Sequence, residues 1–416
     1  MFDRTTAVPP PSPSRPAHLR QANARSLIHL VRTHHPCSKT DLVRLSGLST
    51  PTVSSAISYL ENLGLVESIG DGESSGGRPP EMLRINAKHG YVAAADIGGT
   101  RLRMMLSDLA GSVLSSWSTI FAQDQKTPQA ICSLIRGGLT KMCEEIGVLP
   151  DKVLHLTVGA PGITNVAEGI VQSAPNLTDW VRVPLREILQ RETGVPVIVE
   201  NDTNLAAVGE HWRGAAKGVD NFVFIAMGTG LGAGIYLRGQ LHHGAQWSAG
   251  EIGYLSAHGQ KREFMQMSQL GQLEAMIGGT GIETKWVETL TQAKIPLDSK
   301  LVGLHASQIF DLARDGDPLA VEVIQLTATL LADTITDISL LLDPVIVVLG
   351  GGVGSHPELC RRTQILVQKN EFAQPQLRSS SLGMEAQLFG ALSLSLDASE
   401  ACLLSNCPEV GSKRGT

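Results

Sequence analysis

Three apolar segments of the chain each run directly into a cluster of glycines. Residues 92–95 lead into Asp96-Ile97-Gly98-Gly99-Thr100, residues 222–227 into the run from Gly228 to Gly234, and residues 345–349 into Gly350-Gly351-Gly352. An apolar strand followed at once by glycines is typical of a loop whose backbone N–H groups approach an anion closely. A single glycine turn is common in hairpins. Three such junctions favour a nucleotide cleft between two lobes of an α/β fold.

Length and charge indicate more than one domain. The chain has 416 residues, which predicts two or three domains. Residues 1–90 contain 10 Lys+Arg and 7 Asp+Glu, a net charge of +3, whereas the remainder contains 24 and 33, a net charge of −9. A mildly basic head on an acidic body suits a DNA-binding module fused to a small-molecule domain.

The sequence predicts neither a signal peptide nor a membrane span. Residues 1–17 are rich in Pro and Ser and lack an apolar h-region, which predicts a disordered or extended tail and not a signal peptide. No apolar run reaches the roughly 18 to 20 residues that a membrane span requires. We therefore expect a cytoplasmic protein without a membrane partner. The cysteines are scattered without CxxC spacing and are interpreted as reduced structural thiols: Cys37, Cys132, Cys143, Cys360, Cys402 and Cys407.

The segment from Leu19 to Gly64 has the signals of a helix-turn-helix. Apolar residues at helical spacing predict a first helix over 19–33, and Ser38 is placed to cap a short second helix that ends at Gly47. Ser49 is a good N-cap for a third helix, which Gly64 ends. Two helices joined by a tight Gly-Leu-Ser turn are typical of a DNA-binding helix-turn-helix.

The third predicted helix is the candidate DNA reader. Short polar side chains on its first turns can reach phosphates and base edges in the major groove. Predicted strands at 65–69 and 82–85 flank a Gly/Ser loop and form a wing, from which Arg78 would project toward DNA. A solvated helix in a small bundle is the alternative. The predicted DNA-binding residues are Ser49, Thr50, Thr52, Val53, Ser54, Ser55 and Arg78.

Acidic and amide side chains follow the predicted strand at 197–199. Glu200-Asn201-Asp202 lies at its carboxyl end and precedes a helical stretch, 205–211. A carboxylate in this position can accept a proton from a sugar hydroxyl while neighbouring amides hold the ring. The alternative is an ordinary Asx-type helix cap. Glu251 and Glu274 are further acceptors for a polyol, and each taken alone has the alternative of a surface or cap residue.

Taken together, these motifs resemble the ROK family (repressors, open reading frames and sugar kinases), from about Asn23 to Ala391. The resemblance also includes Gly159-Ala160-Pro161-Gly162 and Pro175-Asn176-Leu177. It implies a winged helix-turn-helix followed by an actin-like, ribonuclease-H-like sugar-kinase fold in two lobes. The expected partition is a disordered tail at 1–17, the winged helix-turn-helix at 18–87, the sugar-kinase-like domain at 88–397 and a flexible tail at 398–416.

The resemblance assigns roles to residues by motif. Asp202 matches the catalytic base of the kinases. The implied sugar-binding residues are Asn176, Asn201, Asp202, Glu251, Tyr254 and Glu274, and the implied nucleotide-binding residues are Asp96, Gly98, Gly99, Thr100, Gly228, Thr229, Gly230, Gly350, Gly351 and Gly352. Mg-ATP is the cofactor that a kinase activity would need.

One departure from the family concerns metal binding. The family usually carries a structural zinc held by a histidine and three cysteines, and the corresponding positions here are Tyr254, Met265, Met267 and Gln272. These side chains lack the thiolate or imidazole donors that zinc requires, so no zinc is expected. His242, His243 and His258 do not match the ligand spacing and are interpreted as ordinary surface histidines.

The sequence therefore predicts a sequence-specific DNA-binding regulator of carbohydrate metabolism genes, foremost a repressor, that responds to a sugar or sugar phosphate. Operator DNA, the effector and a second or further copies in a homodimer or homotetramer are the expected partners. The alternative is an ATP-dependent sugar kinase, alone or as a second activity, with Asp202 as base. A third possibility is that the body serves only as an oligomerisation scaffold.

Overall fold

The computed structural model describes residues 16–73, 79–174, 177–256 and 269–405. The described residues form two compact units. Unit 1 contains the described residues up to Val92, Ser107–Val113 and those from Leu396 onward, and unit 2 contains Ala93–Leu106 and Leu114–Ser395. The predicted tail at 1–17 falls outside the described residues up to position 15, and helix already begins at Pro16.

The N-terminal part of unit 1 folds into three helices and a small antiparallel sheet of order β1-β3-β2. Its N-terminal elements are α1 (Pro16–Thr33), β1 (Cys37–Ser38), α2 (Lys39–Ser46), α3 (Thr50–Asn62), β2 (Val66–Asp71) and β3 (Glu81–Ile85). The Ser38 hydroxyl accepts from the backbone of Asp41, whose carboxylate accepts from Ser38 N–H, so a capping box starts α2. Gly47 ends α2 at φ 68°. The positions of these helices and strands are consistent with the predicted helix-turn-helix and wing strands.

The elements from α1 to β3 form the head of the protein, and its core consists of apolar residues from all three helices. Leu27, Leu42, Ile57 and Leu60 are fully buried. Val53 is buried with them at 0% exposure. The prediction that Val53 contacts DNA is therefore wrong, because its side chain packs inside the head. Arg78 lies outside the described residues.

The rest of the chain contains two five-stranded sheets with the same topology. Their orders are β11-β7-β4-β5-β6 and β14-β13-β12-β15-β16. Numbered along its own half of the chain, each sheet has the order 3-2-1-4-5, with β7–β11 and β12–β15 as parallel pairs. Two copies of this order confirm the actin-like fold with two ribonuclease-H-like halves. A third, three-stranded sheet of order β10-β9-β8 is inserted in the first half.

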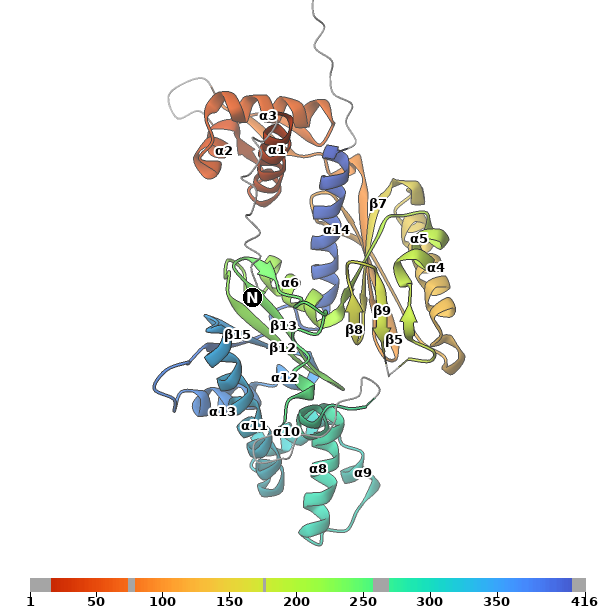
Figure 1. The fold of residues 1–416 in the computed structure, drawn as a ribbon, viewed down its shortest axis with the longest axis vertical. Coiled ribbons are helices and arrows are strands. Elements are labelled where there is room, and N and C mark those ends of the chain that lie inside the picture. Colours follow the sequence, from red (N-terminus) through yellow and green to blue (C-terminus); the bar gives the residue numbers. More distant parts are fainter. Residues whose placement is uncertain (1–15, 74–78, 175–176, 257–268, 406–416) are drawn as a thin grey trace, which may run out of the picture. The chain divides into compact units, whose positions relative to one another are not determined.

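The first half of the fold carries two helices, α4 and α5, that contact each other on one side of its sheet (Figure 1). A third helix, α6, follows β11 directly. The elements are β4 (Tyr91–Ile97), β5 (Arg101–Asp108), β6 (Val113–Ile120), α4 (Pro128–Glu145), β7 (Val153–Ala160), β8 (Ile163–Asn165), β9 (Ile170–Ser173), β10 (Val181–Val183), α5 (Leu185–Thr193), β11 (Val197–Asn201) and α6 (Asp202–Arg213), with 3₁₀ turns at Ala87–His89, Gln123–Gln125 and Pro150–Lys152.

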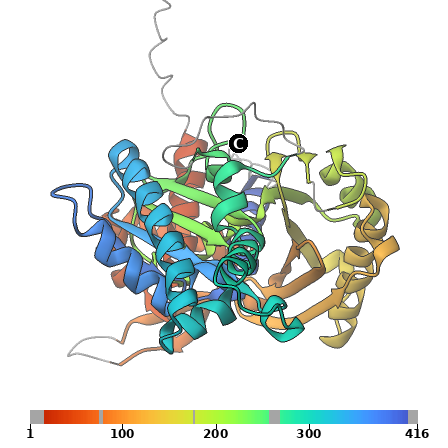
Figure 2. The same cartoon turned by 90° about the horizontal axis from the view of Figure 1, so that it is seen from below.

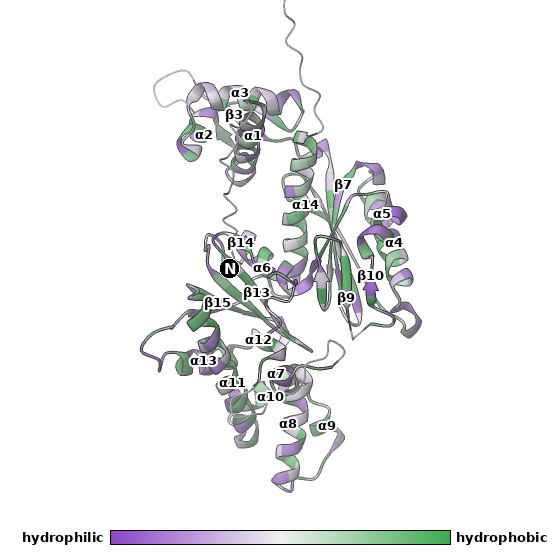
Figure 3. Ribbon diagram, viewed as in Figure 1, coloured by the Kyte–Doolittle hydropathy of each residue, from purple (hydrophilic) through white to green (hydrophobic). Residues whose placement is uncertain are grey.

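The second half is richer in helix, and α8, α10 and α11 pack against one another (Figures 1 and 2). Its strands β12 and β15 are hydrophobic along their length (Figure 3). The elements are β12 (Phe222–Met227), β13 (Leu231–Leu237), β14 (Gln240–Leu241), α7 (Gln272–Ile277), α8 (Gly279–Gln292), α9 (Ser299–Val302), α10 (Ala306–Arg314), α11 (Pro318–Leu342), β15 (Ile346–Gly350), α12 (Gly351–Gly354), α13 (Pro357–Val367), β16 (Gln376–Ser379) and α14 (Ala386–Ser405), with 3₁₀ turns at Ile252–Tyr254 and Gly383–Glu385.

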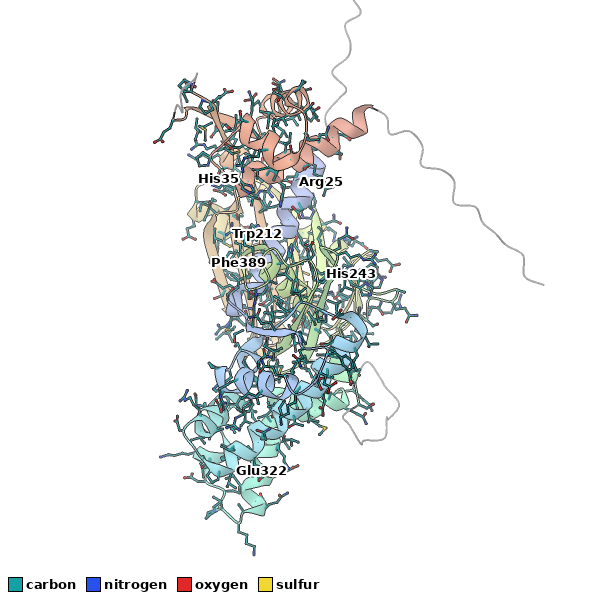
Figure 4. All side chains as sticks on the ribbon, turned by 90° about the vertical axis from the view of Figure 1, so that its left-hand side faces the viewer. Arg25, His35, Trp212, His243, Glu322 and Phe389 are labelled. Carbon is teal, nitrogen blue, oxygen red and sulfur yellow. The ribbon has the colours of Figure 1, made fainter. Side chains whose placement is uncertain are left out.

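Helices α6 and α14 cross with their backbones in contact. A Cβ on Gly209 of α6 would overlap the carbonyl oxygen of Ala386, and a Cβ on Gly390 of α14 would overlap that of Leu205. Only glycine fits at both positions, since the neighbouring atoms are backbone that cannot rotate away. Beside the crossing, the rings of Trp212 and Phe389 meet edge to face at 6.3 Å (Figure 4).

One prediction about the end of the chain needs correction. Residues 398–405, expected to be part of a flexible tail, form the last turns of α14 and group with unit 1. Two helical segments, α11 and Gly383–Ser405, are long and apolar enough to cross a membrane by length and composition alone. At least half of each apolar window is buried within the protein, which is typical of a core helix.

A buried ion-pair cluster joins α1 to the last turns of α14 within unit 1. The guanidinium of Arg32 pairs with Glu400, lies 4.0 Å from Asp397, and donates from Nε to the carbonyl oxygen of Leu109 at 3.1 Å. The side chains of Arg32 and Glu400 are 8% and 4% exposed. Burial lowers the pKa of Arg32 to about 10. Such a pair is costly to break on one side only.

We predict that Arg32→Ala lowers the free energy of unfolding of unit 1 by about 3–5 kcal/mol, because Glu400 is left buried without its cation. Urea unfolding followed by circular dichroism measures this. The matched control is Lys39→Ala, which breaks the exposed pair between Lys39 and Glu81 at 2.9 Å and should change stability by less than about 1 kcal/mol. Equal effects of the two variants would contradict the prediction.

Candidate functional site

The first glycine loop joins β4 to β5 and contains a buried carboxylate. Asp96 is 4% exposed near the end of β4, and Gly98 N–H closes the turn by donating to Arg101 O at 2.9 Å. A guanidinium contacts this carboxylate: Arg103 Nη2 lies 2.6 Å and Nε 3.2 Å from Asp96 Oδ2. Burial raises the pKa of Asp96, and the charge of Arg103 opposes that shift. Gly99 and Thr100 complete the loop as predicted.

The other two glycine loops lie at the ends of the neighbouring strands β12 and β15. In the first, Gly228 N–H donates to Gly230 O at 3.0 Å, and Thr229 lies between them. In the second, a Cβ on Gly350 would overlap the ring of Phe224, and Gly351 has φ 82°. Glycine is thus required for packing at Gly350 and Gly351. By contrast, a Cβ at Gly228 or Gly352 would meet nothing within 4 Å, so packing does not explain these two.

The start of α6 places Asn201 and Asp202 at the carboxyl end of β11. Asn201 is the N-cap: its Oδ1 accepts from Asn204 N–H at 3.0 Å, and its Nδ2 donates to Gly162 O at 2.9 Å. The Asx-type cap, considered as the alternative, is therefore real for Asn201. Asp202 follows in the first helical turn, where its Oδ1 accepts from Thr203 N–H at 2.7 Å. The carboxylate is held in place without a basic partner among these bonds.

Glu251 and Glu274 come together beside β13. A Cβ on Gly250 would overlap Ala233 O, and this close approach of the backbone positions Glu251 next to the strand. Glu274, in the first turn of α7, accepts from Leu231 N–H at 3.1 Å. A Cβ on Gly253 would lie 2.9 Å from the Glu274 carboxylate, so glycine there admits the acid.

Burial and neighbouring carboxyl groups raise the pKa of Asp202 and Glu251. Burial, followed by the charges of Asp96 and Glu251, raises the pKa of Asp202 to about 7. Burial and the charge of Glu274 raise the pKa of Glu251 to about 6, and burial raises that of Glu274. Four of the predicted site residues thus share one electrostatic environment. A set of acids with raised pKa values in one place is typical of a functional site.

The interpretation of His243 as an ordinary surface histidine is wrong. Its Nε2 lies 2.7 Å from Oε2 of Glu200, a carboxylate that is 2% exposed and also accepts from Asn204 Nδ2 at 3.0 Å. The hydrogen bond to Glu200 raises the pKa of His243. Trp247 packs edge to face on the imidazole at 5.3 Å with a backbone φ of 61°. A bulky residue in this region is strained and indicates a constrained loop before Glu251. Figure 4 labels His243.

Several predicted positions are not brought into the site or cannot be placed. Asn176, Met265, Met267 and His258 lie outside the described residues. Tyr254 donates from its hydroxyl to Gln269 O at 3.2 Å, and Gln272 begins α7. Within 16–73, 79–174, 177–256 and 269–405, no group of three or more His, Cys, Asp or Glu is arranged to hold a metal ion. Among the described residues, Cys37, Cys132, Cys143 and Cys360 are free thiols.

We predict that the melting temperature falls as pH rises from about 5 to about 8 and falls less in Asp202→Asn. A carboxyl whose folded pKa is raised to about 7 binds its proton more tightly in the folded state, so its contribution to stability is lost as pH rises toward that value. The raised pKa of His243 acts in the same direction. Asn keeps the acceptor for Thr203 N–H. Parallel pH profiles of the two proteins, measured by differential scanning fluorimetry, would contradict the assignment.

Comparison with known proteins identifies relatives of two kinds. The chain is 33% identical over 310 residues to a glucokinase of Halalkalibacterium halodurans, covering 72% of this chain and 93% of that protein. It is 28% identical over 386 residues to the xylose repressor of Bacillus subtilis, covering 91% and 96%. The repressor therefore matches more of the chain than the kinase does.

Solved structures give the same division. A ROK family transcriptional regulator, described as a homologue of the Escherichia coli MLC protein, superposes with a TM-score of 0.77 at 25% identity and covers 93% of this chain and 98% of its own. A ROK family glucokinase from Streptomyces griseus, in complex with glucose and AMPPNP, has a TM-score of 0.62 at 28% identity and covers 73% and 99%. The profile of the ROK family matches residues 92–398. The chain therefore belongs to the ROK family.

Proposed function

We propose that this chain is a sugar-responsive transcriptional repressor of carbohydrate metabolism genes. The observation that carries this is the combination of a helix-turn-helix head with a sugar-kinase-like body in one chain. The xylose repressor of Bacillus subtilis matches 91% of the chain, whereas the glucokinase of Halalkalibacterium halodurans matches 72% of it. The protein acts in the cytoplasm, where its operator DNA is.

The head binds DNA through the first turns of α3. Ser49, Thr50 and Ser55 are exposed and Thr52 and Ser54 are half-buried, on the same helix that buries Val53 in the core. Ser49 accepts from Thr52 N–H at 3.4 Å and its hydroxyl meets the Thr52 hydroxyl at 2.8 Å, which fixes the start of the helix. A further contact to the DNA backbone is assigned by the sequence to Arg78, which lies outside the described residues. Two heads in a homodimer or homotetramer read two half-sites.

The body binds a sugar with the carboxylates at the start of α6 and beside β13. Asp202, Glu251 and Glu274 accept hydrogen bonds from hydroxyl groups, and Asn176, Asn201 and Tyr254 complete the pocket. The bound sugar favours one arrangement of the body over another, and operator affinity changes because the two arrangements present the heads differently. An oligomerisation scaffold needs no such group of acids.

A sugar kinase is the second candidate function, and one observation favours it. Asp202 is retained in the position of the catalytic base with a pKa of about 7, close to that of an efficient general base at neutral pH. Such an activity would require Mg-ATP at the glycine loops.

We predict that Thr52→Ala combined with Ser54→Ala changes base preference, by about 1–3 kcal/mol for each lost base contact. Arg78→Ala should instead weaken binding to all sequences and reduce the slope of log affinity against log salt by about 1. Selection of binding sites from random duplex DNA, followed by salt titration of the selected duplex, measures both. If all three substitutions left DNA binding unchanged, the head would not be the DNA-binding element.

We predict that one sugar of a panel of aldopentoses, aldohexoses and their phosphates changes affinity for the selected duplex by about 5–150-fold. Glu251→Gln and Asp202→Asn should abolish that response while DNA binding itself remains. Fluorescence anisotropy with labelled duplex measures it. Glu322→Gln is the matched control, because Glu322 is exposed on α11 away from the site residues (Figure 4). A response to the sugar that survives in both site variants would show that the sugar binds elsewhere.

A further inference from the structure

The guanidinium of Arg103 is fully committed to groups of the protein. Nη2 and Nε converge on the same oxygen of Asp96, at 2.6 and 3.2 Å, and Nη1 donates to the carbonyl oxygen of Met384. Asp96 and Arg103 face each other across the β4–β5 hairpin, and Met384 lies in the 3₁₀ turn before α14. The side chains of Arg103 and Asp96 are only 18% and 6% exposed, so solvent weakens this pair little.

Asp96 is also the group that a metal at the first glycine loop would need. Mg²⁺ in phosphate-transfer sites is held by one or two carboxylates together with the phosphates and retains several waters. A guanidinium in direct contact with the only carboxylate of the loop fills that space with a positive charge, which repels a divalent cation. The residues of this loop therefore do not fit Mg-ATP, although the loops at Gly228 and Gly352 remain unobstructed.

The charged groups around the candidate sugar site disfavour a negatively charged ligand. Each charge that shifts the pKa of Asp202 or Glu251 belongs to another carboxylate: Asp96 and Glu251 for the first, and Glu274 for the second. A phosphate dianion placed among these acids would be repelled. Neutral hydroxyl groups, which donate hydrogen bonds to carboxylates, are suited to them.

We propose that the guanidinium of Arg103 occupies the position at Asp96 that a metal ion would take. The body then binds an unphosphorylated sugar and releases it chemically unchanged. In this arrangement Asp202 still accepts a hydrogen bond from a sugar hydroxyl, but no Mg-ATP is bound beside it. The body therefore binds the sugar without transferring a phosphoryl group to it. This inference rests on the proposed function, because it concerns the site that senses the sugar. It selects the neutral sugar over its phosphate as the signal.

Electron paramagnetic resonance of Mn²⁺ in the presence of ATP tests this on the full chain. Wild type should bind no more Mn²⁺ than Asp96→Asn. Arg103→Ala should gain a saturable site, with at least a tenfold increase in affinity, and Asp96→Asn combined with Arg103→Ala should lose it. Arg103→Gln keeps hydrogen-bond donors for Asp96 and Met384 and serves if Arg103→Ala does not fold. Arg136→Gln, an exposed substitution on α4, is the matched control.

Two results would overturn the inference. One is Mn²⁺ binding by wild type that equals that of the Arg103 variants, and the other is release of ADP from Mg-ATP and sugar by wild type at a rate that Asp202→Asn abolishes. Melting of wild type with the sugar panel gives a second reading: a neutral sugar should raise the melting temperature without Mg-ATP, and a larger shift with its phosphate would contradict the proposal. Operator binding measured in the same preparations tests the proposed function separately, since it does not depend on the Mn²⁺ result.

Discussion

The close crossing of α6 and α14 is the constraint on which the arrangement of the body depends. Both helices must present glycine at the crossing, Gly209 on one and Gly390 on the other, because any side chain would strike the opposing backbone. The crossing fixes α6, and the first residues of α6 are the ones that carry the predicted sugar chemistry. Beyond the crossing, the same continuous α14 contributes residues 396–405 to unit 1. This packing contact therefore positions the start of α6, where the candidate sugar-binding residues begin.

A second constraint is the balance of charge near the end of β4. Asp96 is buried with Asp202 close enough to feel its charge, and a fold with both carboxylates ionised and no cation would be destabilised. Two features reduce the repulsion between these carboxylates: the guanidinium of Arg103 pairs with Asp96, and the pKa of Asp202 is raised. The first occupies the carboxylate that a metal ion would need, and the second reduces the negative charge that Asp202 carries. Electrostatic needs of folding and the choice of ligand are thus linked at the same residues.

Much of the architecture follows from local signals in the sequence. Capping by Ser38 and Ser49, the end of α2 at Gly47 and the glycines after β4, β12 and β15 are encoded within a few residues, and the helix-turn-helix and the α/β body could be predicted from them. What could not be predicted depends on contacts between distant residues. Arg103 lies seven positions from Asp96 and meets it only because the hairpin folds back. His243 was misjudged because ligand spacing says nothing about a buried carboxylate such as Glu200. Val53 is the exception, since its position on the apolar face of α3, in line with Ile57 and Leu60, already favoured the core.

The contacts of the last turns of α14 have a consequence for the order in which the protein can be made. Gln21 of α1 donates to the carbonyl oxygen of Leu404, a residue 383 positions further along the chain. The ion pair between Arg32 and Glu400 likewise cannot form until the end of the chain has been synthesised. At about 5–20 residues per second, a ribosome needs roughly 20 to 80 seconds to deliver those partners after α1 has emerged. Throughout that interval Arg32 has no buried carboxylate to meet, and the head is less stable than in the finished chain. A chain that ends before the last turns of α14 therefore lacks these contacts of α1.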